Sequence, residues 1–91
     1  MDYLVDLGLS REEINNIDSS LIESIGLFPL VVKENYETLK ELNLNNEHEV
    51  FVNHLKMFLM NPDKLRNIFG KYDRDDLIRC IEKNHKVIEK L

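Results

Sequence analysis

The segment at residues 46–62 constrains the fold most, because it is the most apolar part of the chain and carries both a start and a stop signal. Asn46 and Glu49 have the spacing of a capping box, and the helix dipole favours an acid in the first turn. Asn61-Pro62 marks the end, because the residue before a proline is pushed out of helical geometry. Apolar side chains recur between these signals at helical spacing: Val50, Phe51, Leu55, Phe58 and Leu59. We therefore predict one central helix with a wide apolar face that other helices must cover.

The chain before this segment carries its own helix signals. Ser10 and Glu13 form an S-x-x-E capping box, which predicts a helix that starts there and ends near Gly26. A break within this helix is expected at residues 18–20, because Asp and Ser side chains compete for backbone groups and prefer caps.

Prolines and acids mark the remaining helix starts. Pro29 suits the first turn of a helix that runs to about Leu42, because a missing N–H costs nothing at that position. Pro62 opens a second helix of this kind, which ends at Gly70. Asp73 caps a last helix that is expected to continue to the C-terminus.

No segment shows the alternation of period two that a strand requires. The prediction is an all-α fold, a compact array of five or six short helices in a single domain over residues 1–91. Shifting the chain against itself by 33 residues pairs Pro29 with Pro62 and Val32 with Leu65. This internal similarity predicts two helix-proline-helix units that resemble repeats.

Three motifs carry a resemblance to a known family. They are Leu7-Gly8-Leu9-Ser10-Arg11-Glu12-Glu13-Ile14, then Phe28-Pro29-Leu30 with Leu39 and Leu42, then Phe58-Leu59-Met60-Asn61-Pro62 with Leu65. Over about residues 4–70 the chain resembles the helical repeats of the mitochondrial transcription termination factor (mTERF) family. The resemblance implies a helical-repeat fold and a transcription-related, nucleic-acid-binding role.

The charge of the chain bears on that role. The net charge of −5 disfavours a nucleic-acid binder, because phosphate contacts normally require a basic surface. The charge is unevenly distributed. Residues 1–45 hold nine acids and three bases, whereas residues 46–91 hold eight acids and nine bases. One half is acidic and the other is faintly basic.

The absence of targeting features in the sequence predicts the compartment. No apolar run approaches the roughly 20 residues that span a bilayer, and the first residues are not those of a signal peptide. A single cysteine, Cys80, agrees with a reducing environment. We expect an intracellular, cytoplasmic protein without a membrane partner.

The residues able to bind a metal through soft ligands are His48, His54, His85 and Cys80. None of their spacings gives the i, i+3 or i, i+4 pair of a helical metal site, so we expect no metal and solvated or partly packed histidines. Cys80 lies within a predicted helix, which favours a buried or half-buried thiol over a reactive one. Paired acids occur at helix starts, and no glycine-rich phosphate loop is present. We expect no cofactor, no small-molecule substrate and no enzymatic activity.

Four bases recur in the predicted last helix: Arg79, Lys83, Lys86 and Lys90. At about 100° per residue they form one stripe opposite the apolar side chains, and such a stripe could follow a phosphate backbone. Asp75 and Glu82 precede Arg79 and Lys86 by four residues, a spacing typical of a solvated helix face. The solvated face is the favoured interpretation, and nucleic-acid binding is the alternative.

The central helix carries more apolar residues than one face needs. The surplus residues are Phe51, Val52, Met57 and Met60. A domain this small is expected to leave part of them uncovered, and methionine suits adaptable binding surfaces. We therefore expect a non-enzymatic interaction module that uses these residues to bind a protein partner or a second copy of itself.

Overall fold

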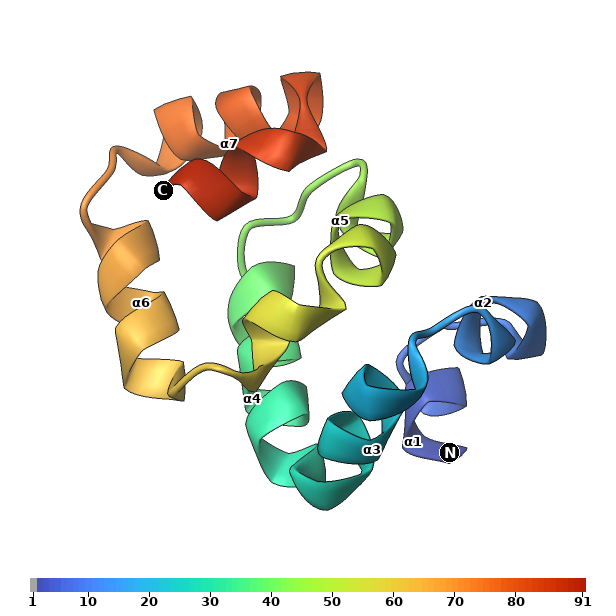
Figure 1. Ribbon diagram of the computed structural model, residues 1–91. Coiled ribbons are helices and arrows are strands. Elements are labelled where there is room, and N and C mark those ends of the chain that lie inside the picture. The colour runs from blue at the N-terminus through green and yellow to red at the C-terminus, as the bar shows by residue number, and fades with distance from the viewer. Residues whose placement is uncertain (1) are drawn as a thin grey trace.

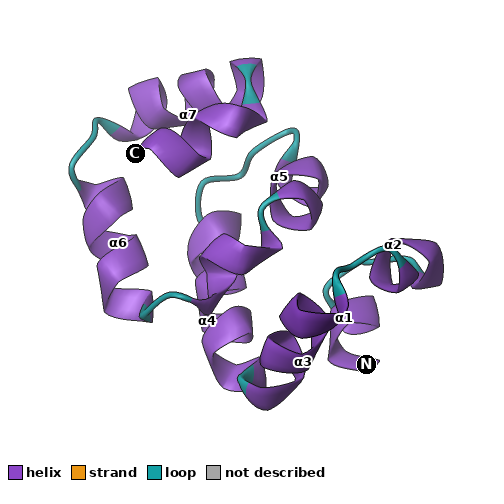
Figure 2. Ribbon diagram, viewed as in Figure 1, coloured by secondary structure: helices purple, strands orange, loops and turns teal. Residues whose placement is uncertain are grey.

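The computed structural model describes residues 2–91, and this part of the chain consists of helices and loops without a strand (Figures 1 and 2). The elements in chain order are α1 (Asp2–Asp6), α2 (Arg11–Asn15), α3 (Ser19–Leu27), α4 (Pro29–Lys40), α5 (Glu47–Asn53), the 3-10 helix η1 (Leu55–Leu59), α6 (Pro62–Gly70), α7 (Arg74–Lys83) and the 3-10 helix η2 (His85–Lys90). The predicted all-α class is confirmed. The elements are shorter and more numerous than expected because two predicted helices are interrupted.

Helix α4 and η1 form the middle of the molecule. Helix α4 packs against α3, α5, η1 and α6, while η2 packs against α5 and α7. In Figure 1 the N-terminal helices α1–α3 lie at one end of the molecule, and α6, α7 and η2 lie at the other. The two chain ends therefore lie on different sides of the fold.

One continuous apolar core joins these elements. Its fully buried members include Leu4, Ile25, Val32, Leu39, Val50, Phe51, Phe58, Leu65, Ile81 and Ile88. Phe51 is at the centre of an aromatic stack. Its ring meets Tyr36 at 4.6 Å and Phe58 at 5.0 Å, both edge to face. Such pairs add to the free energy that burial of the rings already contributes.

The prediction of one continuous central helix is wrong, because the helix is interrupted in its middle. Helix α5 ends at Asn53, His54 leaves helical geometry with φ −129° and ψ 32°, and the chain continues as η1. The expected cap is also absent, because Asn46 makes no side-chain capping bond. The Asn46 amide instead donates to the Ile81 carbonyl oxygen at 3.0 Å. A contact with α7 thus replaces the local cap.

A buried polar side chain holds η1 in place. Asn35 in α4 is fully buried, and its amide donates to the carbonyl oxygens of Phe58 at 2.8 Å and Met60 at 2.9 Å. Carbonyls at the end of a helix have no partner within the helix. Asn35 satisfies two of them and fixes η1 on α4.

The predicted helix starts are largely confirmed. Ser10 and Glu13 form the capping box of α2, and Asp18 caps α3 after a break at the predicted place. Asn61 accepts from the Asp63 N–H at 2.8 Å, and Asp73 caps α7. Pro29 and Pro62 occupy the first turns of α4 and α6. The stop at Gly26 is wrong, because α3 continues through it to Leu27.

The C-terminal helix is shorter than predicted. Helix α7 ends at Lys83, and Asn84 is extended with φ −155° and ψ 105°. The Asn84 side chain accepts from the Lys86 N–H at 3.2 Å and so starts η2. The chain turns at this point, which lets Ile88 enter the core.

Candidate functional site

The structure separates the four residues expected to form one partner surface. Phe51 is fully buried in the aromatic stack, so its assignment to an exposed surface is corrected. Val52 is half-buried and lines an open hollow with Ile17 and Leu21. Met57 and Met60 are half-buried and line a different hollow. Periodicity identified all four as apolar but did not reveal which ones the fold covers.

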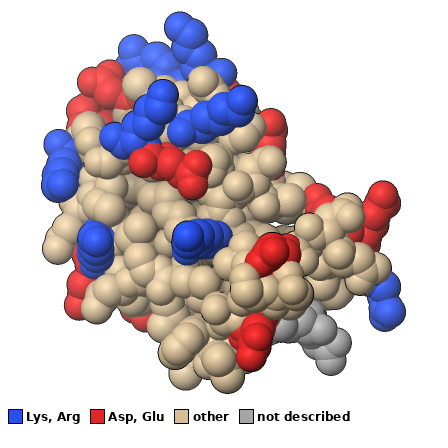
Figure 3. All heavy atoms as spheres, in the orientation of Figure 1, with Lys and Arg blue, Asp and Glu red and all other residues tan. Residues whose placement is uncertain are grey.

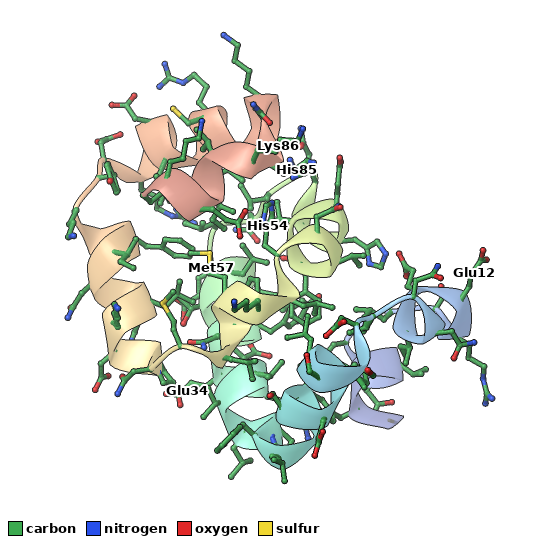
Figure 4. All side chains as sticks on the ribbon, viewed as in Figure 1. Glu12, Glu34, His54, Met57, His85 and Lys86 are labelled. Atoms are coloured by element: carbon green, nitrogen blue, oxygen red, sulfur yellow. The ribbon has the colours of Figure 1, made fainter. Side chains whose placement is uncertain are left out.

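Met57 and Met60 form the floor of an apolar groove, which we call the methionine groove. Its apolar lining is Met57, Met60, Ile68, Ile88 and Leu91, with Lys56 and Glu89 at its edge, and its volume is about 360 Å³. In a 3-10 helix, side chains three residues apart lie on the same side. Met57 in η1 and Met60, the C-cap of η1, therefore point to the same side. Figure 4 shows Met57 on η1, facing the space between α6 and η2.

The four predicted nucleic-acid-binding bases are all exposed but do not form one helical stripe. Arg79 and Lys83 lie on α7, whereas Lys86 and Lys90 lie on η2, beyond the turn at Asn84. In Figure 3, Lys and Arg side chains gather over α7 and η2 at the top of the view, and Asp and Glu predominate around the N-terminal helices. The uneven charge of the sequence is thus also uneven in space.

Ion pairs around these bases differ from the predicted ones. Arg79 pairs with Asp76 at 2.9 Å, one residue from the expected Asp75. Glu82 accepts a hydrogen bond from the Asn45 backbone N–H at 2.8 Å and does not pair with Lys86. Within residues 2–91, Lys83, Lys86 and Lys90 make no ion pair.

Two histidines far apart in the sequence meet next to the methionine groove. Nε2 of His54 lies 2.9 Å from Nδ1 of His85, and we call these two residues the histidine pair (Figure 4). Their outer nitrogens face carboxylates. Nδ1 of His54 is 3.3 Å from Oε2 of Glu89, and Nε2 of His85 is 3.3 Å from Oε1 of Glu49. The expectation of solvated or partly packed histidines fails for His54, which is 5% exposed.

Glu89 and Glu49 lie within ion-pair distance of the outer nitrogens of the histidine pair, but neither contact has the alignment of a hydrogen bond. Nδ1 of His54 is buried and makes no hydrogen bond within the described chain. His54 also lines the same open hollow of about 370 Å³ as Val52, together with Glu89 and Lys56. The buried imidazole therefore borders a space with charged walls.

The third histidine has a separate role. His48 on α5 meets Glu13 on α2, with 3.0 Å between Nε2 and Oε2. The Ser10 backbone N–H and the His48 side chain hold the pKa of Glu13 below its ordinary value. This contact ties the N-terminal helices to α5.

No metal cluster of three or more His, Cys, Asp or Glu is present among residues 2–91. Cys80 is exposed on α7, so the prediction of a buried or half-buried thiol is wrong. Leu77 and Ile81 occupy the buried face of α7, and at about 100° per residue Cys80 lies to one side of that face.

An exposed apolar corner was not predicted as a site. Leu27, Phe28 and Leu30, at the junction of α3 and α4, are 69%, 53% and 78% exposed. The signal was the proline after two apolar residues, which was interpreted only as the start of a helix.

Comparisons with protein-family models, with curated proteins and with solved structures find no match to this chain. Across the described residues, every helix is too short or too polar to cross a membrane.

Proposed function

We propose that this chain is a non-enzymatic interaction module that binds a short amphipathic segment of a protein partner in the methionine groove. The observation that supports it is the apolar lining, which three separate elements contribute: η1, α6 and the C-terminal segment. Apolar side chains that converge on one open space fit the anchor residues of a helix docked in a groove. Two methionines at its floor suit adaptable packing against such anchors.

The charges around the groove suggest the chemistry of the partner. Lys56 lines the groove, and Lys86 and Lys90 lie on η2, the helix that contributes Ile88 to it. None of these three lysines makes an ion pair in the described chain. Glu89 is the acid at the edge, and it lies beside His54. A partner segment with apolar anchors and acidic flanks fits this arrangement better than a basic one, because complementary charges favour the encounter.

Selection from a library of displayed helical peptides tests the proposal. We expect enrichment of peptides with apolar anchors and acidic flanks, and their binding should shift the NMR signals of Met57, Met60 and Ile68. A Met57→Lys, Met60→Lys double variant should lose this binding, because a lysine at either position places charge in the apolar groove. Leu30→Lys is the matched control, since Leu30 is exposed and apolar but lies outside the groove.

Two results would contradict the proposal. The first is a set of peptides that bind the double variant as well as the wild-type protein. The second is binding that Leu30→Lys abolishes and the double variant leaves intact. Light scattering on the free protein separates self-association from binding of another protein, since a dimer lost in the double variant identifies a second copy as the occupant.

Nucleic-acid binding is a second candidate function. It is favoured by the exposed Lys83, Lys86 and Lys90, which lack ion pairs within residues 2–91, and by the resemblance to the mTERF repeats. Fluorescence anisotropy with a mixed-sequence duplex tests it. We expect no binding at about 150 mM salt, because acids outnumber bases and repel the backbone. Micromolar binding that a Lys83→Glu, Lys86→Glu variant abolishes would instead favour this second function.

A further inference from the structure

The two rings of the histidine pair meet head to head. The facing nitrogens are 2.9 Å apart and the ring centres are 5.2 Å apart. The difference is about twice the distance from the centre of an imidazole ring to its nitrogen, so both nitrogens lie close to the line that joins the ring centres. A metal ion on that line would hold the two nitrogens about 4 Å apart, since zinc–nitrogen bonds are about 2.0–2.1 Å. The geometry therefore fits a proton between the rings and not a metal ion.

The number of protons on the pair determines whether this contact holds. A neutral imidazole has one N–H donor and one acceptor, and an imidazolium has two donors. A pair with one positive charge has three protons, enough for the bond between the rings and for one N–H toward each of Glu89 and Glu49. A neutral pair still has a donor and an acceptor for the central bond. A doubly protonated pair directs two N–H groups at each other, and the bond is lost.

Charged groups from several elements surround the pair. Glu89 of η2 faces His54, and Glu49 of α5 faces His85. Lys56 of η1 lines the hollow next to His54, with Glu13 and Asp18 on its far wall. The two nearest groups are the carboxylates, and each faces one outer nitrogen of the pair. A second proton gains no further carboxylate and adds the repulsion between the facing N–H groups.

The pair joins the two places where the predicted helices break. His54 separates α5 from η1, and His85 is the first residue of η2, directly after the turn at Asn84. Helix η2 has only six residues, and so short a helix is not stable without contacts to the rest of the fold. Its contacts include its packing against α5 and α7, the histidine pair and the burial of Ile88.

We infer that the histidine pair is a proton-sensitive switch, which holds η2 on α5 while the pair carries at most one positive charge and releases η2 when both imidazoles are protonated. Histidine suits such a switch, because it is the side chain that can change its charge within the physiological pH range. Release of η2 moves Ile88, Glu89 and Leu91, which also line the methionine groove. The switch itself does not depend on the proposed function, and its test needs no partner.

NMR on the ¹⁵N-labelled protein observes the shared proton directly. At about pH 6.5 we expect a scalar coupling between Nε2 of His54 and Nδ1 of His85 across the hydrogen bond, and we expect it to disappear near pH 5. Hydrogen exchange reports whether η2 opens. The protection factor of the Val87 amide, which donates to the Asn84 carbonyl at 3.1 Å, should fall about tenfold over the same range relative to Leu39 in α4.

Glutamine variants separate the switch from general acid destabilisation. In His54→Gln the amide can donate to or accept from His85 in either protonation state, so the protection of Val87 should no longer depend on pH. His85→Gln should behave in the same way and serves as the second variant. His48→Gln is the matched control, because His48 is outside the pair, and it should keep the wild-type dependence. Protection of Val87 that does not change in the wild-type protein, or that falls equally in both glutamine variants, would overturn the inference.

Discussion

The side-chain amide of Asn35 lies 2.8 Å from the carbonyl oxygen of Phe58, and this bond fixes η1 against α4 across 23 residues of sequence. Both partners are fully buried. A buried carbonyl that loses its donor keeps its full desolvation cost, so the bond matters more than its own strength suggests.

Asn35→Leu should therefore lower the free energy of unfolding by about 2–4 kcal/mol, because the buried Phe58 carbonyl and the partly buried Met60 carbonyl lose their donor at once. The urea concentration at the midpoint of unfolding reports this change, provided that the dependence of the unfolding free energy on urea has the same slope in both proteins. Asn53→Ala is the control, since Asn53 donates to the Glu49 carbonyl on an exposed face. If Asn35→Leu were as stable as the wild-type protein, Asn35 would not hold η1.

Phe51 and Met57 should respond differently to truncation, although the sequence grouped them. Phe51→Ala removes the ring at the centre of the aromatic stack and should cost about 3–5 kcal/mol of stability. Met57→Ala, at the half-buried groove, should cost less and leave the cooperative transition intact. Thermal unfolding followed by circular dichroism compares the two, and equal losses would mean that Met57 belongs to the core.

Tyr3 and Tyr36 should make the fold sensitive to alkali. Burial raises the pKa of Tyr3 to about 12, and burial together with the hydrogen bond to Glu47 raises the pKa of Tyr36 to about 12. The ordinary value is 10.0, so the fold favours the neutral phenols. Their contribution to stability is complete below pH 10 and is lost as the pH rises to about 12.

Urea unfolding at a series of alkaline pH values checks this prediction. Tyr3→Phe and Tyr36→Phe should each flatten the fall in stability, because neither variant has a phenol to ionise at that site. Tyr72→Phe provides the matched control on an exposed tyrosine. A fall in stability at alkaline pH that both Tyr3→Phe and Tyr36→Phe leave unchanged would contradict the assignment of this fall to the two tyrosines.

Glu13 should contribute to stability in the acid range. Its pKa lies below the ordinary 4.5, first because of the Ser10 backbone N–H and then because of His48. The contribution is present above pH 4.5 and is lost as the pH falls through the lowered value. The difference in stability between wild type and Glu13→Gln should thus be seen at pH 7 and shrink as the pH falls below 4.5. A difference that stays constant over this range would mean that the charge of Glu13 has no part in it.

Features that depend on neighbouring residues could be predicted from the sequence. Ser10, Asp73 and the two helix-starting prolines were identified because a cap acts within one turn of its own helix. The break at His54 could not be predicted, because apolar residues recur at helical spacing on both sides of it. Contacts with α7 and η2, from Asn46 to Ile81 and from His54 to His85, stabilise the interrupted form.

The candidate site was predicted only in part for a related reason. Met57 and Met60 were identified from a surplus of apolar residues, but the same surplus included Phe51, which is buried. The groove also needs Ile88 and Leu91, and these reach it only because the chain turns at Asn84. The local signal for that turn is Asn84, which caps η2, and one asparagine within a helical pattern does not by itself predict a break.

The brevity of the helices has a consequence for how the chain folds. The longest described helix, α4, has twelve residues, and isolated helices shorter than about 12–15 residues are marginal in water. No element can therefore persist alone as an intermediate, and each gains its structure when the core around Phe51 and Phe58 closes. Most residues in contact across the molecule are also close along the chain, the topology of rapid folders. We expect a single all-or-none transition, complete within microseconds to milliseconds, in which the ends of the chain acquire their structure together with the centre.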